Sequence, residues 1–140
     1  MVGAAARDMG LEQKFYKVRM RPGKPLMSGV LGGIPLIGLP GNPVSAMVCG
    51  EVFLKPVIDK MMGLPAQERA QQTAILDHDL GQNGNREHYM RAHLSEGKIT
   101  VFDRQDSALL SVLSDANALV VRAPDAAPQK AGESIQYIPL

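Results

Sequence analysis

Residues 34–50 read IPLIGLPGNPVSAMVCG, and this stretch decides the fold class. Residues 34–39 are almost all apolar, which is typical of a strand buried on both faces of a sheet. Asn42 suits the N-cap of a helix, and Pro43 suits the first helical position, where a backbone N–H would have no intrahelical partner. The stretch therefore predicts a strand, a tight turn and an apolar helix. In open α/β sheets such a turn binds anionic ligands.

Shorter elements are predicted before this stretch. Ala4–Leu11 is expected to contain the end of a helix, and Lys14–Met20 is expected to be one strand because it is rich in strand-forming residues. Gly32-Gly33 is a two-residue hairpin signal between the apolar runs Leu26–Leu31 and Ile34–Leu39. The first part of the chain therefore combines a small sheet with helices.

The helix that begins at Pro43 is expected to reach about Met62 and to stop at Gly63. Pro56 lies inside this span, lacks a backbone N–H and crowds the preceding turn. We therefore expect a kink or a break near Lys55.

Composition changes after Gly63, where a polar linker over residues 65–72 is followed by short strands and turns. Five strands are expected, over residues 73–80, 87–94, 99–103, 118–121 and 134–138. Short strands at this spacing predict a small barrel or sandwich. The expected fold class is thus α/β followed by all-β, with a partial α/β domain over residues 1–64 and a β-barrel domain over residues 73–140.

Bulk composition excludes several classes of function. The chain has 140 residues and a net charge of +1, so no global field recruits nucleic acid or a membrane. Its single cysteine cannot form an internal disulfide or a cysteine zinc cluster, and no apolar run approaches the roughly 20 residues of a membrane span. We expect a cytoplasmic protein whose anion binding is local.

A cationic turn at residues 21–25, RPGKP, is the best candidate for that binding. Lys17 and Arg21 are four residues apart, so on one extended strand they would share a face, and Lys24 follows in the turn. Fixed cations and N–H donors suit a phosphate or another oxyanion. The alternative is that these side chains are solvated charges with no ligand.

The order of these motifs resembles one family. RPGKP at 21–25, the glycine hairpin and GLPGNPVS at 38–45 are similar to the C-terminal part of molybdopterin molybdenumtransferases, the family that includes the gephyrin E domain. The resemblance runs from about Ala4 to Leu140 and is strongest over Val18–Met61. It implies the C-terminal part of an α/β molybdopterin-binding domain followed by a small β-barrel domain.

The resemblance also implies a site for molybdopterin and molybdate. It places the ligand cleft between the α/β domain and the β-barrel domain of a dimer partner. Arg91 and Ser107 lie where the family has its arginine and serine segments. The implied binding residues are Lys17, Arg21, Lys24, Pro40, Gly41, Asn42, Pro43, Ser45, Arg91 and Ser107.

The implied reaction belongs to molybdenum cofactor biosynthesis. It is the insertion of molybdate into adenylylated molybdopterin, with Mg²⁺ and release of AMP. The resemblance assigns acidic residues and a phosphate loop to a segment upstream of this sequence, so we expect this chain to supply only the C-terminal part of the site. Its implied partners are a second copy in a homodimer and other proteins of the same biosynthesis.

Two other functions remain open at this point. One is a truncated, non-catalytic binding or scaffold module of the same family. The other is a small barrel that binds nucleic acid, which the net charge of +1 and the 4% aromatic content disfavour. We also expect that an exposed strand edge drives self-association.

The remaining polar residues carry weaker hypotheses. His78, His88 and His93 do not have the spacing of a metal site. Asp79 is expected to be solvated and without a partner. Cys49 lies in the apolar helix, where a small buried hydrophobe is the expected role.

Overall fold

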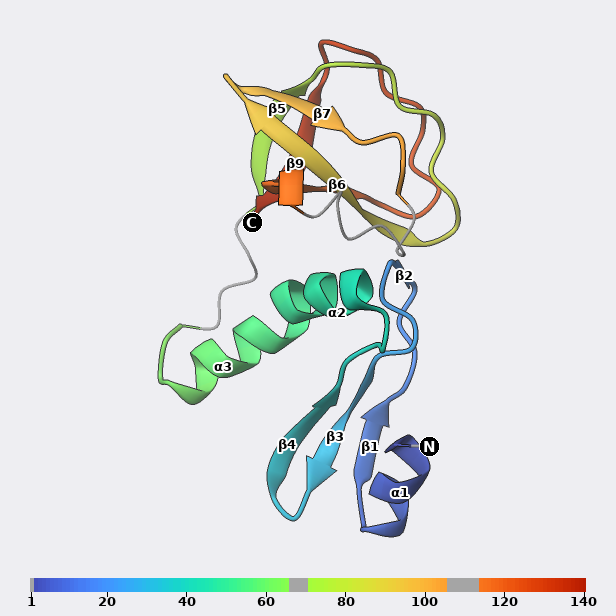
Figure 1. The fold of residues 1–140 in the computed structure, drawn as a ribbon, viewed down its shortest axis with the longest axis vertical. Helices are drawn as coiled ribbons and strands as arrows, with labels where there is room; N and C mark the ends of the chain where they lie inside the picture. Colours follow the sequence, from blue (N-terminus) through green and yellow to red (C-terminus); the bar gives the residue numbers. More distant parts are fainter. Residues whose placement is uncertain (1, 66–70, 106–113) are drawn as a thin grey trace.

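A computed structural model describes residues 2–65, 71–105 and 114–140. Its N-terminal half contains helix α1 (Val2–Asp8) and a three-stranded antiparallel sheet in the order β1-β3-β4 (Figure 1). The strands are β1 (Glu12–Phe15), β3 (Met27–Leu31) and β4 (Ile34–Gly38).

The predicted glycine hairpin is confirmed. Strands β3 and β4 pair from Met27–Gly38 to Leu31–Ile34, and both glycines between them have positive φ angles, 57° for Gly32 and 82° for Gly33. Two left-handed residues in succession twist the chain in the sense that antiparallel strands require. Glycine adopts this conformation without steric cost.

The prediction that β4 is buried on both faces is wrong. Ile34 is 68% exposed, and along the described chain β4 pairs with β3 alone. The apolar sequence therefore belongs to an edge strand whose free side is uncovered in this structure.

The prediction of one strand over Lys14–Met20 is also wrong. Strand β1 ends at Phe15 and pairs with β3, whereas β2 (Met20–Arg21) pairs in parallel with β6 (Glu87–Ser95). The chain changes sheets between these two strands. Lys17 therefore lies in an irregular crossing segment and does not share a strand face with Arg21.

The long helix has the predicted ends and the predicted irregularity. It consists of α2 (Pro43–Cys49), the π-helical segment η1 (Gly50–Leu54) and α3 (Lys55–Met61). The N–H of Lys55 bonds to the carbonyl of Gly50, five residues back. This wider turn accommodates Pro56, which cannot supply the next donor.

The helix ends as the sequence predicts. Gly63 has a φ of 76°, and the N–H groups of Gly63 and Leu64 bond to carbonyls in the last helical turn, at 3.1 and 2.9 Å. This is the hydrogen bonding of a glycine-terminated helix.

The C-terminal half is a closed barrel. Strand β6 is joined by β5 (Gln72–Leu76), β7 (Lys98–Val101), β8 (Ala118–Arg122) and β9 (Ser134–Pro139). Their order is β6-β7-β5-β9-β8, and pairing between β6 and β8 closes the ring. The predicted fold class, α/β followed by a small β-barrel, is thus confirmed. Of the two alternatives that the strand spacing allowed, a barrel or a sandwich, the structure has the barrel.

The two halves share a hydrophobic core. Met20, Leu26 and Val48 pack in the same cluster as Leu119 and Ile138 of the barrel. Residues 66–70 of the expected linker lie outside the described part of the chain. Within the described residues, no helix is long and apolar enough to cross a membrane.

Candidate functional site

A polar cavity of about 510 Å³ lies where the N-terminal half meets the barrel. One wall comes from β2, the turn after it and the start of α2, and the other comes from the barrel. Its lining residues are Met20, Arg21, Pro22, Gly23, Lys24, Ser45, Arg86, Asp103 and Gln105. The cavity therefore joins segments that lie far apart in the sequence.

Gly23 holds the cationic turn against the helix. Its φ of 134° is one that residues with a side chain rarely adopt. A Cβ at this position would lie 2.9 Å from both Cys49 Sγ and Met20 Sδ. The backbone of the turn thus approaches α2 as closely as glycine allows, and this approach sets where the backbone of Arg21 and Lys24 runs.

The start of α2 forms part of the same wall. Asn42 caps the helix, because its Oδ1 accepts a hydrogen bond of 3.1 Å from the N–H of Ser45. Ser45 is buried and lines the cavity. The positive end of the helix therefore lies beside the cationic turn.

Gln105 forms the barrel wall, and Arg91 stands behind it. The Gln105 amide donates hydrogen bonds to the carbonyls of Arg91 and Phe102, at 2.9 and 2.7 Å, and its Oε1 accepts one from the N–H of Arg91 at 3.0 Å. Arg91 itself is only 1% exposed. These bonds fix Gln105 at the cavity surface without freedom to rotate.

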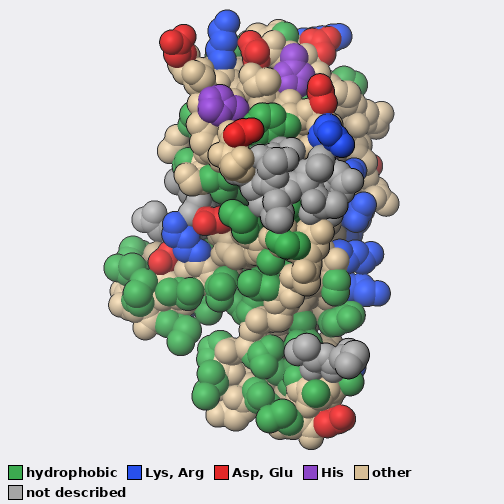
Figure 2. All heavy atoms as spheres, viewed as in Figure 1, with side chains coloured by type: hydrophobic (Ala, Val, Ile, Leu, Met, Phe, Trp, Pro, Cys, Tyr) green, Lys and Arg blue, Asp and Glu red, His purple; other side chains and the backbone are tan. Residues whose placement is uncertain are grey.

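The charge of the cavity favours anions. Arg21, Lys24 and Arg86 line it together with one carboxylate among the described residues, that of Asp103. Lys and Arg side chains also gather along the edge of the molecule that carries β2 (Figure 2). A ligand with two or more negative charges therefore suits the cavity better than a neutral one.

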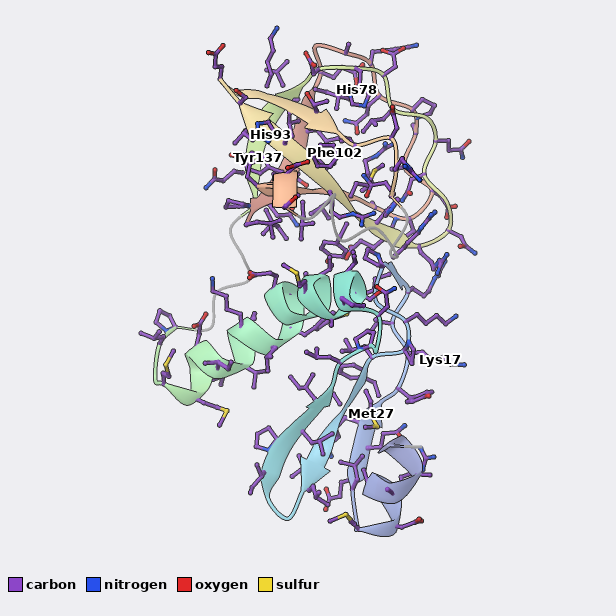
Figure 3. The ribbon with its side chains drawn as sticks, viewed as in Figure 1. Lys17, Met27, His78, His93, Phe102 and Tyr137 are labelled. Carbon is purple, nitrogen blue, oxygen red and sulfur yellow. The ribbon has the colours of Figure 1, made fainter. Side chains whose placement is uncertain are left out.

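The structure brings together three of the residues expected from the sequence, namely Arg21, Lys24 and Ser45. Pro40–Pro43 form the turn and cap that begin α2 and are not among the described lining residues. Lys17 is exposed on the crossing segment, outside the described lining (Figure 3). Ser107 lies outside the described residues.

The sequence pattern did not single out Arg86, Asp103 and Gln105 as ligand-binding residues. Arg86 directly follows the Asn-Gly loop at the entrance to β6, and Gln105 stands two residues before Ser107. The spacing of Arg86 and Gln105 in the sequence does not identify a ligand site. Their role arises because β2 pairs with β6 and so brings the barrel beside the cationic turn.

The Cys49 thiol does not contribute chemistry here. Cys49 is fully buried, and burial raises the pKa of its thiol to about 11, so it stays protonated at neutral pH. In the part of the chain that the structure describes, no three His, Cys, Asp or Glu side chains lie close enough together to hold a metal ion.

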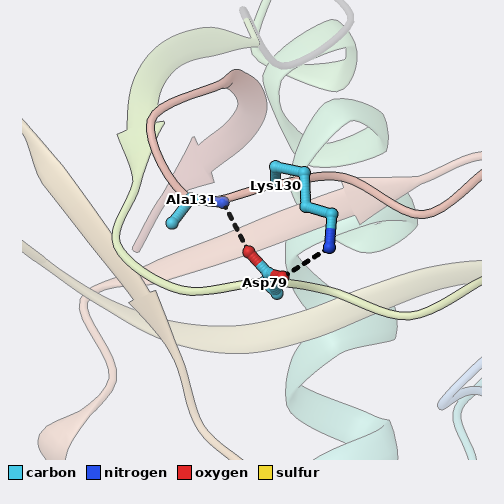
Figure 4. Close-up of polar contacts among 3 residues, drawn as sticks. All are labelled: Asp79, Lys130 and Ala131. Carbon is cyan, nitrogen blue, oxygen red and sulfur yellow. Dashed lines mark hydrogen bonds and ion pairs between the residues drawn. The ribbon is translucent and has the colours of Figure 1, made fainter.

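The expectation that Asp79 has no partner is wrong. Its carboxylate accepts a hydrogen bond of 2.7 Å from Lys130 Nζ and one of 2.9 Å from the N–H of Ala131 (Figure 4). The ammonium of Lys130 lowers the pKa of Asp79. These contacts connect two barrel loops at an exposed position, and they lie away from the cavity.

Two family models match the chain in succession. The one described as a probable molybdopterin binding domain matches residues 2–60, and the one described as the MoeA C-terminal region (domain IV) matches residues 73–140. Solved structures support the fold. A molybdopterin biosynthesis MoeA protein from Pyrococcus horikoshii superposes with a TM-score of 0.83 at 22% identity, over 98% of this chain and 34% of that chain.

Curated relatives are similar over most of the chain. Molybdopterin molybdenumtransferase 2 of Mycobacterium tuberculosis is 37% identical over 131 residues, which are 92% of this chain and 32% of the relative. Molybdopterin molybdenumtransferase of Synechococcus elongatus is 34% identical over 119 residues, 82% of this chain and 28% of the relative. The chain thus spans about a third of these relatives, and it belongs to the molybdopterin molybdenumtransferase (MoeA) family.

Proposed function

We propose that the chain acts in molybdenum cofactor biosynthesis and supplies the oxyanion-binding side of a site that inserts molybdate into adenylylated molybdopterin, with release of AMP. The cavity that joins Arg21, Lys24 and Ser45 to Arg86 and Gln105 carries this proposal. Family membership supplies the substrate class, and the cavity supplies groups that suit it.

The lining matches the chemistry of both substrates. Molybdate and the phosphate groups of adenylylated molybdopterin are oxyanions, which Arg binds through two parallel N–H donors and Lys binds as a point charge. A volume of about 510 Å³ exceeds that of a single tetrahedral ion and lies within the usual range for small-molecule pockets. The cavity therefore has room for molybdate beside part of a larger anionic ligand.

The residues of this chain would act by positioning. Gly23 fixes the backbone of the cationic turn and Arg91 fixes Gln105, so these parts of the cavity wall are in place before an anion arrives. Holding molybdate beside the dithiolene of the pterin favours their reaction through proximity and charge stabilisation. Arg91 and Ser107 remain proposed members of the site, Arg91 through Gln105.

Magnesium does not fit the described side of this site. Asp103 is the one carboxylate among the described lining residues, and three cationic side chains line the same cavity. These cations repel a divalent metal ion, which prefers several oxygen ligands. No step of the proposal therefore passes through Mg²⁺ bound to these residues.

Calorimetric titration with molybdate and with adenylylated molybdopterin tests the proposal. We expect saturable binding that Arg21→Ala and Lys24→Ala each weaken by roughly tenfold or more, the usual effect of losing a hydrogen bond to a charged group. Lys98→Ala is the matched control, because Lys98 is exposed on β7 away from the cavity. Lys17→Ala is expected to have a smaller effect than Arg21→Ala.

The outcomes distinguish a molybdate-inserting site from a non-catalytic scaffold module of the same family. Binding that is lost in the Arg21 and Lys24 variants but kept in Lys98→Ala supports the proposal. A folded chain that binds neither compound contradicts it and favours the non-catalytic scaffold module. Equal losses of binding and thermal stability in the Arg21 variant would also contradict it, because they indicate a structural role.

A further inference from the structure

A second, smaller cavity of about 240 Å³ lies on the barrel side of β2. Arg21 lines both cavities, whereas Lys24 and Ser45 line the first and not the second. The residues that line the second cavity are Arg21, Leu80, Gly81, Gln82, Asn83, Gly84, His88, Met90 and Arg122. Its size and its lining therefore distinguish it from the site described above.

Three basic side chains lie in one row beside this cavity. Strand β6 lies between β2 and β8, and His88 is the register partner of Arg21 on one side and of Arg122 on the other. Direct cross-strand partners project from the same face of a sheet. Arg21 and Arg122 place two positive charges on either side of His88, and an anion between them would reduce their repulsion.

Arg122 is buried with part of its hydrogen-bonding capacity unused. It is 3% exposed, and its Nη2 donates to the carbonyl of Ala127 at 2.6 Å and to those of Gly81 and Ala126 at 3.3 Å. Its Nε is buried and has no partner among the described residues, and no described carboxylate forms an ion pair with it. The buried charge of Arg122 has carbonyl partners but no described carboxylate partner, so an anion in the adjoining cavity would offset part of the cost of its burial.

The loop over the cavity is held in place. Asn83 Nδ2 donates to the carbonyls of Ala123, Arg86 and Arg122, at 2.6, 3.0 and 3.3 Å. The N–H of Asn83 bonds to the carbonyl of Ala126 at 2.9 Å. The cavity wall is therefore preformed and is not a gap between mobile segments.

We propose that this cavity is a second anion site that binds a small tetrahedral oxyanion such as sulfate, phosphate or molybdate between Arg21, His88 and Arg122. The volume suits one such ion with a few waters and falls below the usual range for small-molecule pockets. The second site stands independently of the reaction proposed above, because it rests on residues of the barrel and on Arg21 alone among the residues of the first site.

His88 reports on the occupant of this cavity. Burial, together with the charges of Arg21, Arg86, Arg91 and Arg122, lowers the pKa of His88 to about 4. Arg21 lies on β2, Arg86 directly precedes β6, Arg91 lies on β6 and Arg122 lies on β8. An anion in the row offsets their effect, so binding raises the pKa of His88 towards its ordinary value and tightens as the pH falls.

Nuclear magnetic resonance of the histidine rings tests this proposal on the whole chain. Sulfate, phosphate and molybdate are titrated in turn, with chloride at matched ionic strength as the reference. We expect each oxyanion that binds to shift the His88 ring resonances saturably and to raise the pKa of His88. The rings of His78 and His93, which lie outside the cavity, are expected to change little.

Variants separate the two sites. Measured by calorimetric titration in a Lys24→Ala background, His88→Leu is expected to weaken oxyanion binding at the second cavity about tenfold or more, while His88→Gln retains binding but loses its dependence on pH. Lys24→Ala affects the first cavity only, so failure at one site is distinguishable from failure at the other. His78→Gln is the matched control. Shifts of equal size at all three histidines, or no saturation by any of the three oxyanions, would overturn the proposal.

Discussion

At the scale of single residues, two glycines with similar sequence surroundings have different tasks. Gly23 and Gly41 each stand beside prolines in turns next to the cavity. A Cβ on Gly23 would collide with Cys49 and Met20, whereas a Cβ on Gly41 would meet nothing within 4 Å. The sequence marks both as turn residues, but only the packing shows that one of them is sterically required.

This difference predicts the effect of two substitutions. Gly23→Ala is expected to lower the free energy of unfolding by roughly 2 kcal/mol, because it overpacks the contact with α2 and forces alanine into a φ that it rarely adopts. The displaced turn also lowers affinity for molybdate. Gly41→Ala, the matched control, is expected to change stability by about 0.5 kcal/mol or less. Urea unfolding measures both, and equal losses would contradict the packing argument.

At the scale of elements, local sequence signals located the helix ends and the barrel strands well. The cap at Asn42, the stop at Gly63 and the irregularity before Pro56 are all present. These features depend on backbone chemistry within a few residues, so the sequence contains them. The strand expected over Lys14–Met20 failed because its two ends pair with different sheets, which is a long-range effect.

The cap at Asn42 yields a prediction for the long helix. Asn42→Ala removes the acceptor of the 3.1 Å bond from the Ser45 N–H and is expected to cost about 1 kcal/mol of stability. Asn42→Ser retains a capping oxygen and is expected to stay within a few tenths of a kcal/mol of the unsubstituted chain. Thermal unfolding of the three proteins checks this. An Asn42→Ser variant as unstable as Asn42→Ala would show that the cap is not the cause.

At the scale of the whole molecule, the two halves differ in how well they cover their apolar side chains. Most of the exposed large hydrophobic residues lie in the N-terminal half, including Met9, Ile34 and Met61. The hydrophobic surface extends over the helix and the small sheet in Figure 2. Edge strand β1 carries Glu12 and Lys14, whereas the other edge, β4, is apolar. Charged edges resist pairing with other chains, and apolar edges invite it.

We therefore predict that the chain self-associates through β4. Sedimentation velocity is expected to show a weight-average mass that rises with concentration. Ile34→Lys, which places a charge on the exposed edge, is expected to reduce this association. Ile75→Lys is the matched control, because Ile75 is 43% exposed on the barrel. A concentration-independent monomer, or equal effects of the two substitutions, would contradict the role of β4.

The sequence by itself determined the family, the fold class, the glycine hairpin, the capped and interrupted helix, and the cationic turn with Arg21 and Lys24. The family follows from the resemblance of these motifs, and the local features depend on the conformational limits of glycine and proline, on capping, or on apolar patterning over short distances. Only the tertiary structure decided which cations share a cavity. Pairing of β2 with β6 brings Arg86 and Gln105 to the first cavity and aligns Arg21, His88 and Arg122 beside the second. Contacts between strands so far apart in sequence are set by register and packing, which no local pattern encodes.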